Sequence, residues 1–200
     1  MRVFLADDAA DRRACGAEYR IAFAAGVLRD GGVIAHATEG VWGLACSVDS
    51  QEAVWRILAS KRRSWRKGLI LVAGCPAPFE RLLNALPQTR RAAVLGTWPG
   101  PATWLVPHAQ QMPDWITGTS DRVALRVTAH AQFAALCRRA GVPLVSTSAN
   151  RAGMTPVASA WDARRVFGAE IDAVLPGRLG SAAGPSAIRD ALTGEQVRAG

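Results

Sequence analysis

The alternation of helix-forming and strand-forming segments is the feature of this sequence that most constrains its fold. Apolar residues recur at helical spacing from Ala14 to Asp30, where the glycines Gly31 and Gly32 end the pattern. A short apolar run typical of a strand follows at 33–37. The same succession continues, and we expect further helices over 49–58, 79–86, 90–95, 130–140 and 160–167, further strands over 69–73, 102–106, 123–127, 142–146 and 171–175, and a strand pair over 186–197.

Such alternation predicts an α/β fold, in which helices cover the faces of a sheet. The connections after Leu95 and the C-terminal strand pair favour a twisted, mixed parallel and antiparallel sheet over a purely parallel one. The 200 residues contain no repeat or long linker, so we expect a single domain over 1–200. Ligands of such sheets bind beyond the carboxyl ends of the strands, which draws attention to Thr38 and Glu39, to 146–150, and to the turn before Ser186.

Charge and hydropathy limit the kinds of partner. Lysine and arginine total 24 against 16 acidic residues, a net charge of +8. A positive field favours nucleotides, RNA or DNA without choosing among them, and a generally arginine-rich surface explains it equally well. No apolar run reaches the roughly 18 residues of a membrane helix. The N-terminus carries Asp7 and Asp8 and lacks the layout of a signal peptide. We therefore expect a cytoplasmic protein without membrane contact.

Several familiar catalytic and metal-binding patterns are absent from the sequence. The four cysteines form no CxxC pair and the three histidines are scattered, so we expect no metal cluster. There is no GxxxxGK[ST] loop, no GxGxxG fingerprint and no GxSxG elbow. A reaction whose nucleophile comes from its substrates would fit these absences.

The first segment that could carry chemistry is HATEGVWGL at 36–44. A strand would deliver Thr38 and Glu39 into a loop with Gly40 and Gly43, and glycines let a ligand approach the backbone closely. An ordinary turn is the alternative.

The second segment, 56–67, contains six cations and no acid. Lys61 and Arg63 would fall where a helix ends, and the helix dipole favours cations there. Converging cations suit a triphosphate, which arginine can clamp with two hydrogen bonds. A solvated basic face, or a patch that binds RNA phosphates, are the alternatives.

Two further segments place hydroxyl groups near strand ends. Ser-Thr-Ser-Ala-Asn at 146–150 would directly follow a strand that ends at Val145. Because such groups are costly to bury without partners, they indicate a polar pocket for phosphate or substrate, with a capped turn as the alternative. A Gly-Pro turn at 184–185 would present Ser186 at the start of a strand.

Taken together and in this order, these segments resemble the YrdC/TsaC family of threonylcarbamoyl-AMP synthases, in its short form. The likeness extends from about residue 31 to residue 200. Three positions depart from the family pattern, where Ala37, Ser64 and Ala187 replace proline, proline and threonine. None removes a charge. The matching elements are Thr38-Glu39 through Leu44, Lys61-Arg62-Arg63 followed by Lys67-Gly68-Leu69, Trp98-Pro99-Gly100-Pro101 followed by Thr103, Val123 to Val127, Ser146 to Asn150, and Pro185 to Asp190 followed by Arg198.

The resemblance implies a YrdC-like fold and a nucleotidyltransferase that makes threonylcarbamoyl-AMP from L-threonine, bicarbonate and ATP. It implies release of pyrophosphate, and use of the product by threonylcarbamoyl-transfer proteins that modify tRNA. Mg²⁺ is implied as a phosphate-bound ion, without a metal site on the protein. The implied catalytic residues are Lys61 and Arg63, the ATP-binding residues are Lys61, Arg63, Ser148, Asn150 and Arg198, and the threonine-binding residues are Thr38, Arg126 and Ser186.

Two other functions remain open at this point. One is an RNA-binding module for tRNA or rRNA maturation, which the basic segment would serve. The other is a paralogue that adenylates a different substrate, since a fold alone does not fix a function.

Overall fold

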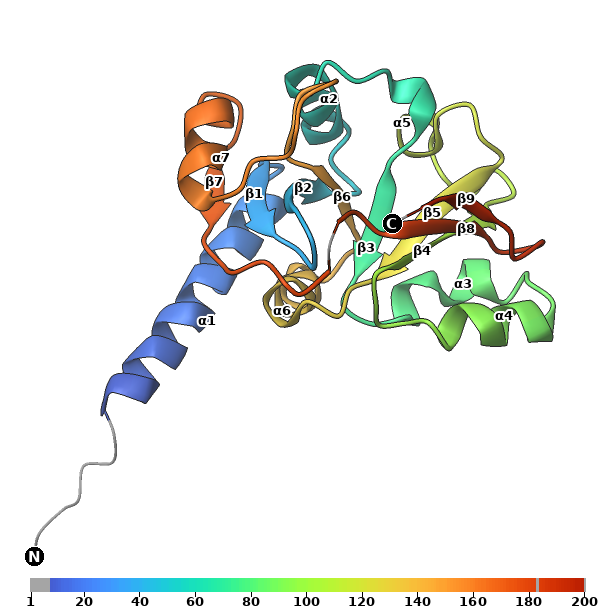
Figure 1. Cartoon of the computed structure of the whole chain (residues 1–200), viewed down its shortest axis with the longest axis horizontal. Coiled ribbons are helices and arrows are strands. Elements are labelled where there is room, and N and C mark those ends of the chain that lie inside the picture. The colour runs from blue at the N-terminus through green and yellow to red at the C-terminus, as the bar shows by residue number, and fades with distance from the viewer. Residues whose placement is uncertain (1–7, 183, 200) are drawn as a thin grey trace, which may run out of the picture.

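A computed structural model describes residues 8–182 and 184–199, with side chains described from Gly16 onward. One mixed sheet runs through the molecule and helices lie on both of its faces (Figure 1). Its strand order is β7-β1-β2-β6-β3-β5-β4-β8-β9. The strands are β1 (Ile34–Ala37), β2 (Trp42–Ser47), β3 (Ile70–Ala73), β4 (Ala102–Pro107), β5 (Arg122–Val127), β6 (Leu144–Ser148), β7 (Ala173–Leu175), β8 (Ala187–Asp190) and β9 (Gln196–Arg198).

The sheet confirms the predicted mixture of strand directions. Strands β1 and β7, β3 and β5, and β4 and β8 pair in parallel, and the remaining neighbours pair antiparallel. The helices are α1 (Asp8–Arg29), α2 (Gln51–Ser60), α3 (Glu80–Leu83), α4 (Gln88–Leu95), α5 (Asp114–Thr117), α6 (Ala131–Ala140) and α7 (Ala160–Phe167), with short 3-10 turns at η1 (Trp65–Lys67) and η2 (Ala77–Phe79).

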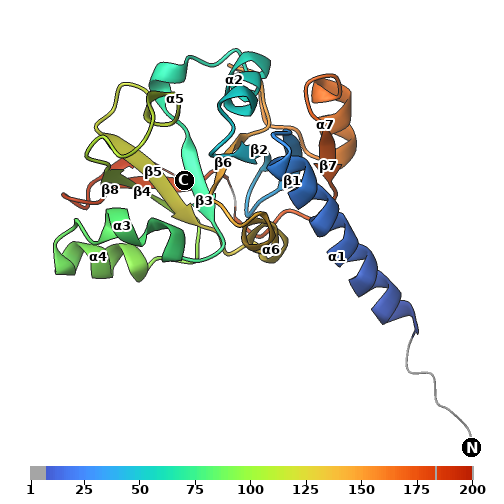
Figure 2. The same ribbon diagram turned by 180° about the vertical axis from the view of Figure 1, so that it is seen from behind.

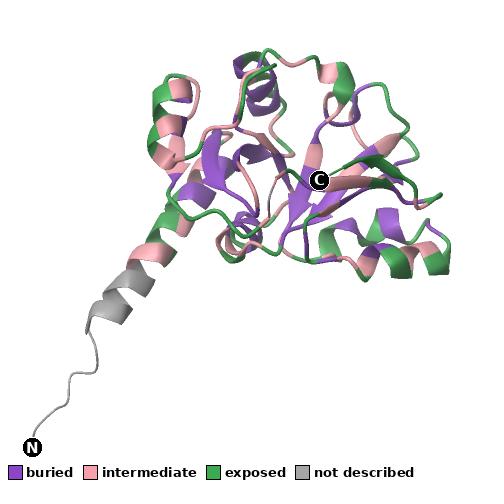
Figure 3. Ribbon diagram, in the orientation of Figure 1, coloured by how far each residue is buried: buried purple, intermediate pink, exposed green. Residues whose placement is uncertain are grey.

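Two apolar clusters hold the helices to opposite faces of the sheet. The smaller cluster joins α1 and α6 to one face, with Leu28 and Phe133 among its fully buried side chains. The view from behind shows α1 running past α6 and outward from the body (Figure 2). The larger cluster packs the remaining helices on the other face and includes Ile57 and Leu125. The strands at the centre are accordingly buried, while the outer sides of the helices are exposed (Figure 3).

Side chains along β5 alternate between the two faces of the sheet, so that Arg126 lies on the face away from the larger core. Val123, Leu125 and Val127 belong to that core, so Arg126 points to the face that carries α1 and α6. Strands β3 and β6 alternate in the same way, with Val72 and Leu144 on the α1/α6 side. Those two helices leave part of this face free, and the polar residues gather there.

Two predictions about local structure are wrong, and for the same reason. The strand expected over 142–146 was placed with its end at Val145 or Ser146, but β6 continues through Ser148. Gly43 was expected in a loop, but it lies in β2 and pairs with Ser148. Polar or small residues on a strand that faces a hollow do not show the apolar alternation by which strands are recognised.

The helix that leads into the basic segment forms close to the predicted bounds. Ser50 is its N-cap, and the hydroxyl oxygen of Ser50 accepts a hydrogen bond from the backbone N–H of Ala53 at 3.3 Å. The helix ends at Ser60, and Lys61 is the C-cap. Arg63 therefore lies in the following loop, as expected. None of the helices described in the structure is long and apolar enough to cross a membrane.

Candidate functional site

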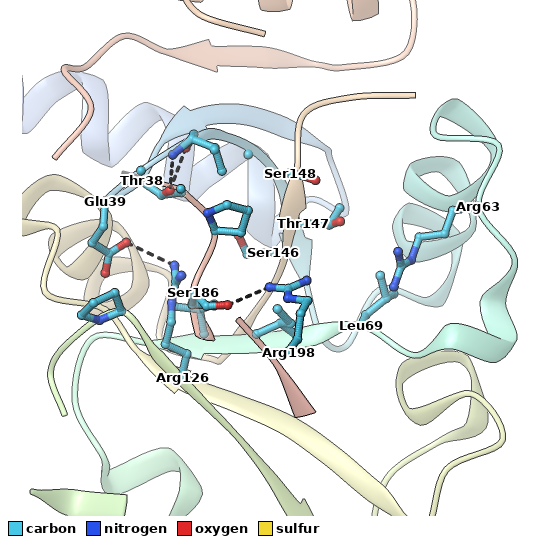
Figure 4. A pocket seen from close by; sticks show the side chains of 18 residues that line it. Thr38, Glu39, Arg63, Leu69, Arg126, Ser146, Thr147, Ser148, Ser186 and Arg198 are labelled. Carbon is cyan, nitrogen blue, oxygen red and sulfur yellow. Dashed lines mark hydrogen bonds and ion pairs between the residues drawn. The ribbon is translucent and has the colours of Figure 1, made fainter. Parts of the chain in front are cut away.

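A hollow on the α1/α6 side of the sheet, here called the central hollow, collects side chains from parts of the chain that are far apart in the sequence (Figure 4). Its floor consists of β3, β5 and β6, and its rim consists of the β1–β2 turn, the loop after α2, the segment 184–186 and β9. Six of the eight predicted site residues line it, namely Thr38, Arg63, Arg126, Ser148, Ser186 and Arg198. The other two, Lys61 and Asn150, are not among its lining residues.

The turn between β1 and β2 is closed by Thr38 itself. The Thr38 hydroxyl donates a hydrogen bond to the Val41 carbonyl at 2.7 Å, and the Thr38 N–H donates to the same oxygen at 3.2 Å. Because its hydroxyl hydrogen is already used, Thr38 can serve a ligand only through its oxygen. Next to it, a Cβ on Gly40 would lie 2.1 Å from the Gly184 carbonyl oxygen. Glycine at this position therefore lets 184–186 lie close to the turn.

Glu39 and Arg126 form a buried ion pair at one end of the central hollow. The Arg126 Nη2 atom lies 3.2 Å from Glu39 Oε2. The other carboxylate oxygen, Oε1, accepts from the Thr128 hydroxyl at 2.7 Å and from the Ala129 N–H at 3.0 Å. Burial alone would raise the pKa of Glu39, but the Arg126 charge and these hydrogen bonds outweigh it and lower the pKa. Glu39 is thus held as an anion.

Arg126 keeps a buried donor that a ligand could use. Burial lowers its pKa, which the charge of Glu39 partly offsets, and guanidinium groups stay protonated in proteins. Its Nε atom is buried and has no hydrogen-bond partner among the described residues. An unused buried donor beside a hollow is the arrangement expected where a ligand oxygen binds.

Arg63 and Arg198 line another part of the central hollow without a carboxylate partner among residues 16–182 and 184–199. Arg63 Nη2 donates to the Gly68 carbonyl at 2.9 Å, and Arg198 Nη2 donates to the Ser186 carbonyl at 2.8 Å. Burial, and then the like charge of Arg198, lower the pKa of Arg63. Two cations that repel each other would be stabilised by a polyanion between them.

Lys61 and Asn150 lie behind Ser148 and hold it in place. The buried Lys61 ammonium donates to the Ser148 carbonyl, to the Asn150 carbonyl at 2.8 Å and to Asn150 Oδ1 at 3.3 Å. An ammonium has three donors, so all are used here. Asn150 Oδ1 also accepts from the Ser148 hydroxyl at 2.5 Å, and Asn150 Nδ2 donates to the Met154 carbonyl at 2.7 Å. Burial and the charge of Arg63 lower the pKa of Lys61 to about 8.

Ser186 is buried and bonded to a second hydroxyl. Its Oγ atom lies 2.7 Å from Oγ1 of Thr103, which comes from β4 and is fully buried. Thr103, Thr128 and Glu39 are not among the eight predicted site residues. Thr128 directly follows the strand that carries Arg126, and a polar residue at a strand end is a signal that could have identified it.

The described residues provide neither a metal cage nor an enzymic nucleophile in the central hollow. No group of three or more His, Cys, Asp or Glu side chains within 16–182 and 184–199 could hold a metal ion. Glu39 is the carboxylate of the lining, and both of its oxygens are engaged. The lining contains no histidine or cysteine. The arrangement can orient substrates and neutralise charge, and no histidine lies in the lining to activate its serine or threonine hydroxyls.

Comparison with known proteins gives one consistent result. The family model Sua5_yciO_yrdC, described as "Telomere recombination", matches residues 26–200. A protein of Pseudomonas aeruginosa named threonylcarbamoyl-AMP synthase is 47% identical over 180 residues, which cover 90% of this chain and 97% of that protein. One of the same name from Cellvibrio japonicus is 48% identical over 179 residues, which cover 90% and 95%.

A solved structure with a bound amino acid is also similar. The crystal structure of P. abyssi Sua5 complexed with L-threonine superposes with a TM-score of 0.80 at 31% identity. The alignment covers 86% of this chain and 51% of that one, so the Sua5 chain has a further portion that this chain does not match. The two bacterial relatives, by contrast, are matched over nearly their whole length.

Proposed function

This chain belongs to the Sua5/YciO/YrdC family, and we propose that it catalyses the synthesis of threonylcarbamoyl-AMP from L-threonine, bicarbonate and ATP, with release of pyrophosphate. It is then a nucleotidyltransferase that acts on a small-molecule acceptor. We also propose that it works in the cytoplasm as a single domain.

The observation that carries this proposal is the convergence of two residue sets on the central hollow. Thr38, Arg126 and Ser186, expected to bind threonine, line the same hollow as Arg63 and Arg198, two of the three cations expected to bind ATP. A reaction between the two substrates requires such a shared space, because the reacting atoms must come within about 3–3.5 Å of each other.

The chemistry needs no protein nucleophile. The threonine amine combines with bicarbonate to give a carbamate and water. A carbamate oxygen then attacks the α-phosphorus of ATP, and the bond to the β-phosphate breaks, so that pyrophosphate leaves with the electron pair. The protein contributes by holding these groups in line and by offsetting the negative charge of the phosphates.

The arginines divide this work. We assign the threonine carboxylate to Arg126, through the Nε donor that has no protein partner. Arg63 and Arg198 take the phosphates, which supply the anionic partner that both lack among the described residues. Thr38 offers its hydroxyl oxygen to the amino acid.

Lys61 contributes indirectly, through residues that line the hollow. The resemblance assigns Lys61 and Asn150 to ATP, and both hold Ser148, which does line the central hollow. Lys61 thus supports the nucleotide side by fixing 148–150, and its positive charge adds to that of Arg63.

Mg²⁺ would enter as part of the substrate. The lining does not fit a dedicated metal site, since the oxygens of Glu39 are taken by Arg126, Thr128 and Ala129. A phosphate-bound ion can do without such a cage, because Mg²⁺ retains several waters when phosphates bind it.

We further propose that the product passes to threonylcarbamoyl-transfer proteins for the modification of tRNA. The exposed cations Arg62, Arg66 and Lys67 lie in the same segment as Arg63 and offer a surface that tRNA phosphates could contact. Such contact would weaken as salt concentration rises, whereas adenylation in the buried site would depend less on salt.

The test is a reaction with α-labelled ATP, Mg²⁺ and bicarbonate in the presence of each amino acid in turn. The proposal predicts a new AMP adduct and pyrophosphate with L-threonine plus bicarbonate, and with no other amino acid. Absence of any adduct from folded protein that still binds ATP would reject it. An adduct with a different amino acid would identify a paralogue with another substrate.

A further inference from the structure

Thr103 and Ser186 form a pair of hydrogen-bonded hydroxyl groups beside the threonine end of the central hollow. Ser186 is held from two sides, since its carbonyl accepts from Arg198 at 2.8 Å and its hydroxyl lies 2.7 Å from Thr103 Oγ1 (Figure 4 shows the bond to Arg198). Thr103 lies in β4, which pairs in parallel with β8 just after Ser186. Ser186 lines the central hollow, and Thr103 does not.

The direction of the bond between the two hydroxyls follows from burial. Each hydroxyl has one hydrogen to donate, and a buried hydrogen without an acceptor is costly. Within the described residues, Ser186 Oγ is the recorded partner of Thr103 Oγ1, which is fully buried. Donation from Thr103 to Ser186 is the favoured direction, because the reverse direction would leave the Thr103 hydrogen with no acceptor among the described residues.

The direction of this bond determines where the hydroxyl hydrogen of Ser186 can point. Since Ser186 accepts from Thr103, its own hydrogen is free to point into the central hollow. We propose that Thr103 is a positioning residue that fixes Ser186 as a hydrogen-bond donor to the carboxylate of the amino-acid substrate. This rests on the proposed function, in which the free Arg126 Nε donor binds the same carboxylate.

The experiment compares variants at both positions of the full chain. Steady-state kinetics would be measured with L-threonine and ATP varied in turn for wild type, Thr103→Val, Thr103→Ser, Ser186→Ala and the double variant Thr103→Val/Ser186→Ala. Thr103→Val should raise KM for L-threonine about tenfold, the size of one buried hydrogen bond, while KM for ATP changes less than about twofold. Thr103→Ser retains the donor and should behave like wild type.

The double variant separates positioning from general damage. If Thr103 acts through Ser186, adding Thr103→Val to Ser186→Ala should cost little more than Ser186→Ala alone. Three results would overturn the inference. They are losses in the double variant that equal the sum of the two single variants, an unchanged KM for L-threonine in Thr103→Val, and equal increases in the KM values for L-threonine and ATP. Should Thr103→Val not fold, as judged by thermal unfolding, Thr103→Ala removes the same hydroxyl without added bulk, and its result is read in the same way. A wild type that forms no threonine adduct would instead defeat the proposed function.

Discussion

Arg126 and the pair Arg63 and Arg198 are cations in the same hollow with opposite surroundings. Arg126 is buried against Glu39, whose charge it neutralises and whose carboxylate is fixed by two further hydrogen bonds. Arg63 and Arg198 have no carboxylate partner among the described residues, and burial followed by the charge of Arg198 lowers the pKa of Arg63. The threonine end is thus assembled before any ligand arrives, whereas the nucleotide end carries unneutralised charge.

This difference suits the two substrates. An amino acid is a small zwitterion, and a site for it needs a few fixed donors more than net charge. ATP is a polyanion, and cations that lack a protein partner gain most from binding it. The difference also predicts different consequences of substitution at the two ends. Substitutions at the threonine end should lower the unfolding free energy, and substitutions at the nucleotide end should mainly weaken the binding of ATP.

The largest effect is expected from Arg126→Met. It leaves the Glu39 carboxylate buried and unpaired, which costs about 3–5 kcal/mol of unfolding free energy, and it removes the carboxylate contact for threonine. Denaturant unfolding would measure the first loss and the adduct assay the second. The double variant Arg126→Met/Glu39→Gln should recover most of the stability and none of the activity. Recovery of both would show that Arg126 does not bind substrate.

A smaller effect, confined to ATP, is expected from Arg63→Gln and Arg198→Gln. Each should raise KM for ATP about tenfold through the loss of one charge-assisted hydrogen bond. Each variant also loses one hydrogen bond to a backbone carbonyl, which the relieved repulsion partly offsets, so unfolding free energy should fall by no more than about 1 kcal/mol. Lys67→Gln is the matched control, since Lys67 is exposed in the same basic segment and does not line the hollow. Equal losses in all three variants would favour a diffuse electrostatic effect.

A third effect tests how firmly the threonine end is fixed. Thr128→Val removes the 2.7 Å hydrogen bond to Glu39 while Arg126 and the Ala129 N–H remain. We expect a loss of about 2 kcal/mol of unfolding free energy, typical of a hydrogen bond to a charged group, with a modest rise in KM for threonine. A rise in KM for ATP alone would contradict the assignment of the two ends. Thr128→Ser, which keeps the hydroxyl, is the control.

The fourth effect is a pH dependence that comes from Lys61. Its pKa is lowered from 10.5 to about 8 in the folded protein, so between these values the unfolded chain binds more protons. The contribution of Lys61 to unfolding free energy should therefore rise with pH across this window, by up to about 1 kcal/mol per pH unit. Wild type minus Lys61→Met, measured by denaturant unfolding at several pH values, should show this slope. A flat difference would mean that Lys61 titrates normally.

The sequence predicted the architecture better than the contacts. Helical spacing with cap residues identified α2 and α6 closely, since Ser50 and Gly141 are strong local signals. β2 was missed because its Gly43 faces the hollow, and β6 was ended too early because Ser146 and Ser148 are polar on that same face. In both cases the sheet pairing between β2 and β6 outweighs local residue preference.

The site shows the same limit at the level of single side chains. The density of positive charge drew attention to Arg63, and the family resemblance drew attention to Arg126 and Arg198; all three line the hollow. They did not predict that Glu39 would pair with Arg126, 87 residues away, or that Lys61 would hold Ser148 across a similar separation. Such pairs depend on which strands become neighbours, and the sheet order here is far from the chain order.

Isothermal titration of each substrate into two variants tests the central claim most directly, namely that the hollow has separate threonine and nucleotide ends. The variants are Arg126→Met/Glu39→Gln, which keeps the fold without a charged pair, and Arg63→Gln/Arg198→Gln. We expect Arg126→Met/Glu39→Gln to lose L-threonine binding and still bind ATP. We expect Arg63→Gln/Arg198→Gln to lose ATP binding and still bind L-threonine. Loss of both ligands in each variant, or the reverse pattern, would contradict this claim.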